Sequence, residues 1–540
     1  MLNRFSRLVE ALPRASLVFT TIVASSLLAV PREADAASTL RIAISLSDVP
    51  VLWAAPDGGF EGARFGGYTV FDPLVTWDLS SETAPSRLVP GLAESWTVDP
   101  DNKKRWTFKL REAVFHDGSP WNADAALWNL DAFTNQKAPQ YNALRAGIAR
   151  TRTQSIASYG KIDDHTIFIE TKEVNSFLLF ELSSMFFASP ARFAEVGNDW
   201  QKFSQNPSGT GPYKFVSLRP GQELELAANT QYWDKKRVPK MERLTILPVP
   251  EPNTRVAALR SGQVDLIETL PPDSIEALKG AGFKITANVY PHTWIWRLNF
   301  NEGTPFADVR IRKAANLAID RESIVELVEK TAEPAKGYAP PDAPWFGKPS
   351  FNLRYDPTEA KKLLAEAGYG PNKPVNVKIV ISSSGGGQMV PLSMNEQIQE
   401  NLRAVGINVT YDVRDFTAMI NMLRAGAKSV GADGLNVAMT MQEPGSGIAS
   451  YESTLIPPAG SNWGSYKNPD FDAAIKAARA EFDPAKQEEA MKKVNEVLTD
   501  DAAALLVVHD FGPRAMSSKV KGFIQARNWY QDYTSIQVSE

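Results

Sequence analysis

Residues 375–383 read VNVKIVISS, and they open the part of the sequence that decides the fold. The apolar, branched residues gather over the length of a strand. A glycine-rich loop, SSSGGGQ (382–388), follows, and then a helical pattern, MNEQIQENLRAVG (394–406), that ends at a glycine. The next run, INVTYDV (407–413), again has strand character. These segments predict a βαβ unit with the glycine loop at the carboxyl end of its strand, where open α/β sheets bind ligands.

The glycine loop has neither the G-x-G-x-x-G pattern nor the P-loop pattern. We therefore do not expect a site for a nucleotide phosphate. An ordinary connector is the alternative to a ligand-binding loop, because glycine accumulates in loops in any case.

Strands and helices alternate along the rest of the chain as well. Strand-like runs occur at 39–46, 105–110, 165–170, 224–228 and 243–249. Between them, Asp356, Asn468 and Asp483 each precede a proline and predict a helix start, and Asp273-Ser274-Ile275-Glu276 predicts a capping box. The fold class is therefore α/β, and the length predicts two or three domains.

The first 36 residues have the pattern of a secretory signal. Arg4, Arg7 and Arg14 precede an apolar stretch at 15–30, and Ala34-Asp35-Ala36 forms an A-x-A cleavage site. We expect export to a bacterial periplasm and cleavage after about Ala36, with an uncleaved anchor as the alternative.

Composition excludes several classes of site. The chain has no cysteine, so it has no disulfide, no thiolate nucleophile and no cysteine-ligated metal. A formal net charge of −4 argues against nucleic acid as a partner. The 13 tryptophans suit a protein that encloses a small ligand. We expect no cofactor.

The histidines do not form a recognisable catalytic or metal-binding pattern. The chain has four, His116, His165, His292 and His509, and none is paired at a spacing typical of zinc ligands. The G-x-S-x-G signature of serine hydrolases is also missing. The stretch FHDGSPWNAD (115–124) predicts a turn followed by a helix capped by Asn122, not a catalytic relay.

Several stretches together resemble the family 5 extracellular solute-binding proteins, the receptors of bacterial ABC importers for peptides, nickel chelates, opines and sugars. They include LVPGLAESWTVDPDNKKRWTFKLREAVFHDGSPWNADAALWNL (88–130), NPSGTGPYKFV (206–216), NTRVAALRSGQVDLIE (253–268), LNFNEGTPFADVRIRKAANLAIDRESIV (298–325) and YKNPDFDAAI (466–475). The similarity runs in order through nearly the whole chain after residue 36.

The resemblance implies two lobes joined by crossing strands near 290–300 and 505–512, with a subdomain inserted in the first lobe. The expected division is 1–36 signal peptide, 37–72 first lobe, 73–205 inserted subdomain, 206–293 first lobe, 294–509 second lobe and 510–540 first lobe. Such a receptor closes around its ligand by a hinge motion and does no chemistry. Its partners would be a small or peptide-like solute and the importer's membrane subunits, and we expect a monomer.

The resemblance also implies where dipeptide receptors hold their ligand, and this chain departs there. The position of the aspartate that holds the ligand's amine falls on Thr440, that of the arginine for its carboxylate on Gly385, and that of the packing tryptophan on Val413. A buried zwitterion needs opposite charges. We therefore expect a solute that is not a simple dipeptide.

The candidate ligand-binding residues follow from these positions and from aromatic side chains near the strand crossings. They are Trp53, Trp294, Trp296, Gly385, Gly387, Gln388, Arg414, Thr440, Met441, Gln442 and Glu443. Core packing is the alternative for each tryptophan, and a solvated surface charge is the alternative for Arg414 and Glu443.

Two other functions stay open at this point. A receptor for a metal chelate could use one histidine, His292 or His509. A periplasmic hydrolase would need His116 or His509 as a base.

Overall fold

The computed structural model describes residues 37–57, 59–289, 292–440 and 446–539. Ser38–Glu540 forms one compact unit. Within the described ranges, no helix has both the length and the apolar character needed to cross a membrane. The candidate residues Met441, Gln442 and Glu443 and the expected signal segment lie outside the described residues.

One seven-stranded sheet collects strands from three separate parts of the chain. Its order is β10 (Tyr213–Arg219), β11 (Glu223–Ala228), β12 (Arg243–Pro248), β1 (Thr39–Ile44), β13 (Leu266–Ile267), β22 (Arg514–Met516) and β14 (Lys284–Thr286). β1 is central and parallel to both of its neighbours. Leu40, Ile42 and Ile44 alternate along β1 and are fully buried in the largest core cluster.

A second sheet contains the predicted βαβ unit. The path runs β16 (Ala332–Pro334), β21 (Ala504–Asp510), β15 (His292–Leu298), β19 (Gly434–Leu435), β17 (Val375–Ser382) and β18 (Ile407–Arg414), and β20 (Met439–Thr440) pairs with β15. β17 and β18 are parallel, and α13 (Pro391–Val405) connects them. The βαβ prediction is confirmed, although α13 begins at Pro391, three residues before the predicted start.

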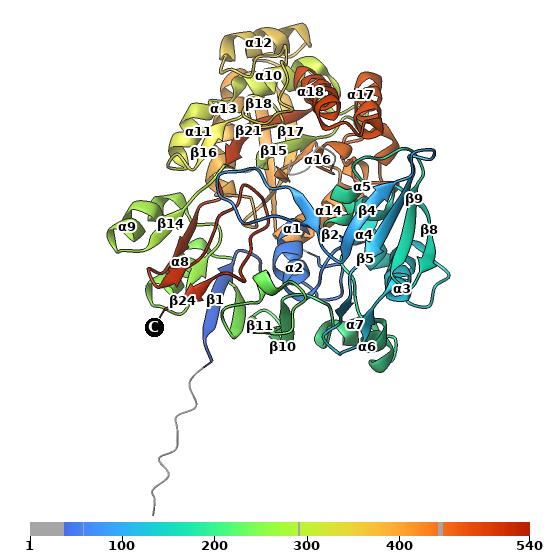
Figure 1. The fold of residues 1–540 in the computed structure, drawn as a ribbon. Coiled ribbons are helices and arrows are strands. Elements are labelled where there is room, and N and C mark those ends of the chain that lie inside the picture. Colours follow the sequence, from blue (N-terminus) through green and yellow to red (C-terminus); the bar gives the residue numbers. More distant parts are fainter. Residues whose placement is uncertain (1–36, 58, 290–291, 441–445, 540) are drawn as a thin grey trace, which may run out of the picture. The chain divides into compact units, whose positions relative to one another are not determined.

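The two sheets are connected by the predicted crossing segments. β14 leads into β15, and β21 leads into β22, so each connection leaves one sheet and enters the other. β15 and β21 pair in antiparallel fashion, with Thr293 opposite His509. The crossing segments therefore lie side by side in the second sheet, as Figure 1 shows.

A separate four-stranded antiparallel sheet is formed by the part of the sequence that follows β1 and precedes β10. Its order is β4 (Ala93–Val98), β5 (Arg105–Leu110), β9 (Thr166–Thr171) and β8 (Ile156–Asp163). The helices α3 (Ala123–Thr134) and α4 (Ala143–Thr153) belong to this region, on the right of Figure 1. The boundaries proposed at 73, 206, 294 and 510 stay predictions.

Most of the predicted helix starts are confirmed by their caps. The side chains of Asp356, Asn468 and Asp483 accept hydrogen bonds from the first turns of α12 (Pro357–Glu366), α17 (Pro469–Ala480) and α18 (Pro484–Asp500). The capping box at Asp273 is wrong. A short 3-10 turn at Pro272–Ser274 precedes α9 (Ile275–Gly280), and Ser274 makes no side-chain cap.

The FHDG stretch is a turn that braces a neighbouring loop. His116 donates its backbone N–H to the Gly209 carbonyl at 2.8 Å, and its ring Nε2 lies 2.9 Å from the carbonyl oxygen of Gly211. Asp117 accepts from the N–H of Ser119 at 2.9 Å, and Gly118 has φ +87°. Burial lowers the pKa of His116 to about 4, so the ring is neutral at pH 7.

Candidate ligand-binding site

A cavity of about 360 Å³ is lined by segments that are far apart in the sequence. Phe60 and Glu61 come from the segment after β1, Ile148 and Arg152 come from α4, and a third group comes from the part of the chain that forms the second sheet. Trp529, close to the C-terminus, also lines it. Its volume is in the range of small-molecule sites.

One helix supplies the apolar wall of the cavity. α14 (Phe416–Ala425) begins after Asp415, whose carboxylate accepts from the N–H groups of Thr417 and Ala418. Phe416, Ile420 and Leu423 follow at helical spacing, so they share one face, and all three line the cavity. A ligand in the cavity would therefore contact an apolar surface on this side.

Gly385, Gly386 and Gly387 let the glycine loop approach the residues around the cavity closely, because they carry no side chains. Gly387 has φ +71°, and a Cβ there would lie 2.5 Å from Nε2 of His292 and 2.8 Å from the Trp529 ring. Gly385 has φ +133°, and a Cβ there would lie 2.4 Å from the Phe416 ring. Glycine is thus required both by the backbone conformation and by the close approach.

The described lining of the cavity carries more positive than negative charge. The arginines among its described lining residues are Arg150, Arg152, Arg297 and Arg424, and the acidic one is Glu61. Burial lowers the pKa of Arg424, and the nearby Arg152 lowers it further. Arg152 donates to the Ser184 hydroxyl at 2.8 Å.

Glu61 belongs to a buried charge network beside the cavity. Arg64 lies 3.4 Å from Glu61 and 3.0 Å from Glu268, and Arg514 lies 2.8 Å from Glu268. Burial raises the pKa of Glu61, and neither of its carboxylate oxygens accepts a hydrogen bond. Burial would also raise the pKa of Glu268, but Arg514 and Arg64 outweigh it and hold that pKa below its usual value.

Two histidines lie at the strand crossings. His292 lines the cavity, and its Nδ1 is 2.5 Å from Oδ2 of Asp510. His509 is buried with Nδ1 3.0 Å from the Thr293 hydroxyl, and burial lowers its pKa to about 4. Among the described residues, no three His, Cys, Asp or Glu side chains form a group that could hold a metal ion.

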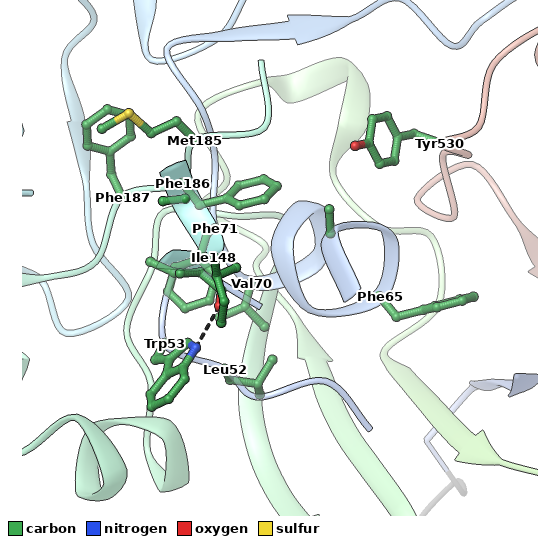
Figure 2. Packing of buried hydrophobic residues seen from close by; sticks show 14 of the residues in the cluster. Leu52, Trp53, Phe65, Val70, Phe71, Ile148, Met185, Phe186, Phe187 and Tyr530 are labelled. Atoms are coloured by element: carbon green, nitrogen blue, oxygen red, sulfur yellow. Dashed lines mark hydrogen bonds between the residues drawn. The ribbon is translucent and has the colours of Figure 1, made fainter. Parts of the chain in front are cut away.

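The three candidate tryptophans pack in the core and do not line the cavity. Figure 2 shows Trp53 among buried apolar side chains, and its indole N–H donates to the Ala55 carbonyl at 2.6 Å. Trp294 donates to the carbonyl of Gln388 at 3.1 Å, and Trp296 donates to the side chain of Asn395 at 2.8 Å. The structure thus favours the core-packing alternative for these residues.

The remaining described candidates differ in how they lie relative to the cavity. Gln388 lines the cavity with Oε1 buried and without a hydrogen-bond partner, and Gly385 and Gly387 lie beside it in the glycine loop. Thr440 is placed by its backbone in β20, opposite His292. Arg414 is exposed and pairs with Asp412 at 2.7 Å, away from the cavity.

Sequence reasoning missed Arg297, Glu61, Phe416 and the arginines of α4. One signal was available for Arg297. It is the single charge in the apolar strand HTWIWRL (292–298), where burial of a charge is costly unless a partner or a ligand balances it. Glu61 and Phe416 give no such local signal.

Comparisons with known proteins agree with this architecture. Residues 87–446 match the model of the family described as bacterial extracellular solute-binding proteins, family 5 Middle. Di/tripeptide-binding protein 2 of Pseudomonas aeruginosa (strain UCBPP-PA14) is 27% identical over 516 residues, which are 90% of this chain and 93% of that protein.

Solved structures share the two-lobed fold. The periplasmic binding protein DppA from Helicobacter pylori, in complex with the peptide STSA, has a TM-score of 0.81 at 21% identity and covers 93% of this chain and 98% of its own. The binding protein MoaA from A. tumefaciens R10, in complex with mannopinic acid, has a TM-score of 0.78 at 23% identity and covers 94% of this chain and 100% of its own. The family match covers well over half of the chain, and the chain belongs to the bacterial extracellular solute-binding proteins of family 5.

Proposed function

We propose that this chain is the receptor of an ABC importer, which captures a small organic solute in the 360 Å³ cavity and delivers it to the membrane subunits. The observation that carries the proposal is the lining of the cavity. Side chains from the first-sheet part, from α4 and from the second-sheet part surround one space, so a ligand there would hold these parts together. The receptor acts in the periplasm as a monomer, after cleavage near Ala36.

The solute is not a simple dipeptide. The positions that would hold a dipeptide's two charges carry Thr440 and Gly385, and a Cβ at Gly385 would already collide with Phe416. Val413, at the position of the packing tryptophan, is 49% exposed and does not line the cavity. Relatives include a di/tripeptide-binding protein and a protein solved with mannopinic acid, so an opine, a sugar derivative or a longer peptide-like solute fits the family equally well.

A metal-chelate receptor is the second candidate. It is favoured by one observation, that His292 lines the cavity and could bind a metal carried by its own chelator. A hydrolase has less support, since neither His116 nor His509 lines the cavity.

A thermal-shift screen of the ligand-stripped protein from Ala37 onward tests the proposal. The panel contains free dipeptides, longer peptides, opines, sugars and sugar acids, and nickel with and without histidine as chelator. A ligand at one hundred times its Kd adds about 2.7 kcal/mol to the free energy of unfolding. Stabilisation by dipeptides alone would contradict the proposed class of solute, and stabilisation by chelated nickel alone would favour the second candidate.

A further inference from the structure

The buried arginines of the described chain fall into two groups. Seven arginines are buried: Arg64, Arg145, Arg255, Arg297, Arg312, Arg321 and Arg514. Six of them donate to protein acceptors: Arg64 and Arg514 to Glu268, Arg312 to Asp501, and Arg145, Arg255 and Arg321 to backbone carbonyls. Arg64, Arg312 and Arg514 are paired with a carboxylate. Arg145 is only partly satisfied, because its Nη1 and Nη2 are buried without a partner.

Arg297 is the one of these seven that lines the 360 Å³ cavity. Its residue is only 9% exposed, its Nε has no hydrogen-bond partner, and no described carboxylate forms an ion pair with it. Burial lowers the pKa of Arg297, and the groups that act in the opposite direction are two tyrosines, Tyr451 and Tyr338. The protein therefore holds a buried cation without an anion to balance it.

The position of Arg297 is fixed and faces the cavity. Arg297 lies in the central strand β15, where its backbone pairs with Leu435 on one side and Ala504 on the other. The preceding residue, Trp296, anchors the opposite face of the strand in the core. Arg297 itself lines the 360 Å³ cavity. A guanidinium group at this place can meet a planar acid in the cavity with its fork of N–H donors.

We infer that Arg297 is the residue that binds an acid group of the solute, a carboxylate or another oxyanion, and so selects anionic cargo. The inference rests on the proposed function and names the chemistry of its solute. A guanidinium and a carboxylate form short, charge-assisted hydrogen bonds that are often bidentate. Binding would supply the counter-charge that the protein itself does not supply to Arg297.

The other charges of the cavity agree with an anionic solute. Arg150, Arg152 and Arg424 add positive charge, and the described acidic lining residue, Glu61, is already paired with Arg64. Arg297 does not occupy the position at which dipeptide receptors carry their arginine, which is Gly385 here. The selection of an acid therefore comes from a different strand, one that crosses between the sheets.

Matched pairs of acids and neutral analogues test the inference. The probes are an N-acetyl dipeptide and its amide, an opine-type N-carboxyalkyl amino acid and its amide, glucuronate and glucose, and glucose 6-phosphate and glucose. Calorimetry measures the Kd of each for the wild type. We expect at least one acid to bind about 10- to 100-fold more tightly than its neutral partner, which is the range of a charge-assisted hydrogen bond. The carboxylate and phosphate pairs distinguish the two kinds of oxyanion.

Three variants separate binding from folding. Arg297→Met should remove the preference for the acid, and Arg297→Lys should keep part of it, because lysine retains the charge but not the planar fork. Without ligand, Arg297→Met should melt no lower than the wild type, because it removes an unbalanced buried charge. The control is Arg321→Met, which should melt lower, because Arg321 donates to the carbonyls of Leu506 and Asn316.

Each outcome decides a different question. If acids bind no better than their neutral partners, or if Arg297→Met keeps the preference, the inference is overturned while the receptor function stands. If Arg297→Met melts as low as Arg321→Met, Arg297 is a structural residue and the inference is overturned as well. If no solute of any class binds the wild type, the proposed function itself fails, and the melting of ligand-free Arg297→Met still decides whether Arg297 is structural.

Discussion

Nδ1 of His292 and Oδ2 of Asp510 lie 2.5 Å apart and join β15 to β21 at the ends of the two strands that lead from one sheet to the other. Both side chains are 2% exposed. The other carboxylate oxygen of Asp510 accepts from the N–H of Gly512 at 2.8 Å, in the connection to β22. One carboxylate therefore holds both a crossing strand and the turn that follows it.

Asp510→Ala should lower the free energy of unfolding by about 1–3 kcal/mol, because it removes the acceptor of both bonds. Asp510→Asn keeps an acceptor oxygen and should lose less. Urea unfolding of both variants measures the difference. Equal stability of Asp510→Ala and the wild type would show that this contact contributes nothing to the crossing.

The buried carboxylate of Glu268 should make the free energy of unfolding fall at acidic pH. Its oxygens accept from Arg64 and Arg514 and from the Tyr533 hydroxyl at 2.9 Å. Its pKa is held below the usual 4.5, so its stabilisation is complete above that pH and is lost as the pH falls through the lower, folded-state pKa. Glu268→Gln should be less stable than the wild type by about 3–5 kcal/mol at pH 7, because it leaves two buried arginines without their shared anion.

Thermal unfolding between pH 7 and pH 3 tests this prediction. The difference between wild type and Glu268→Gln should narrow below pH 4.5, because Glu268 is protonated first in the unfolded wild type and only at its lower pKa in the folded wild type. A difference that stays constant down to pH 3 would contradict the assigned ionisation.

Gly387→Ala should weaken both folding and solute binding, because the new Cβ would collide with His292 and Trp529 at the cavity wall. The control is Gly406→Ala. Gly406 also has a positive φ, +99°, but a Cβ there meets nothing within 4 Å. We expect Gly406→Ala to cost only the backbone strain, about 1–2 kcal/mol, and to leave the Kd unchanged. Equal effects of the two substitutions on the Kd would show that the glycine loop is not part of the solute-binding site.

His116→Leu should lower stability by about 1 kcal/mol and leave solute affinity unchanged, because His116 bonds to Gly211 and does not line the cavity. The folded protein disfavours protonation of this ring, whose pKa falls from 6.5 to about 4. The wild type should therefore lose stability between pH 6.5 and pH 4, and the variant should lose less over that window. A changed Kd would argue against a scaffolding role.

Local patterns predicted much of the fold. The caps at Asp356, Asn468 and Asp483 and the strands on either side of the glycine loop depend on neighbours in sequence, and the structure confirms them. The capping box at Asp273 failed, because a proline-led 3-10 turn took the place of the first helical turn.

The site was harder to predict, because its groups come from distant segments. Alternation indicated that Trp294 and Trp296 share a face of β15, and both belong to the same core cluster, but the pattern did not tell which face meets the core. The face that reaches the cavity carries Arg297 instead. Arg297 lines the same cavity as Phe416 and Glu61, and no short stretch of sequence shows that these distant segments meet.

The most direct measurement is a crystal structure of the protein with the solute that stabilises it most in the thermal-shift screen. We predict electron density for the solute in the 360 Å³ cavity, with an acid group on Arg297 and an apolar part against Phe416 and Ile420. A solute bound outside this cavity, or one inside it that leaves Arg297 without an anion, would contradict the account.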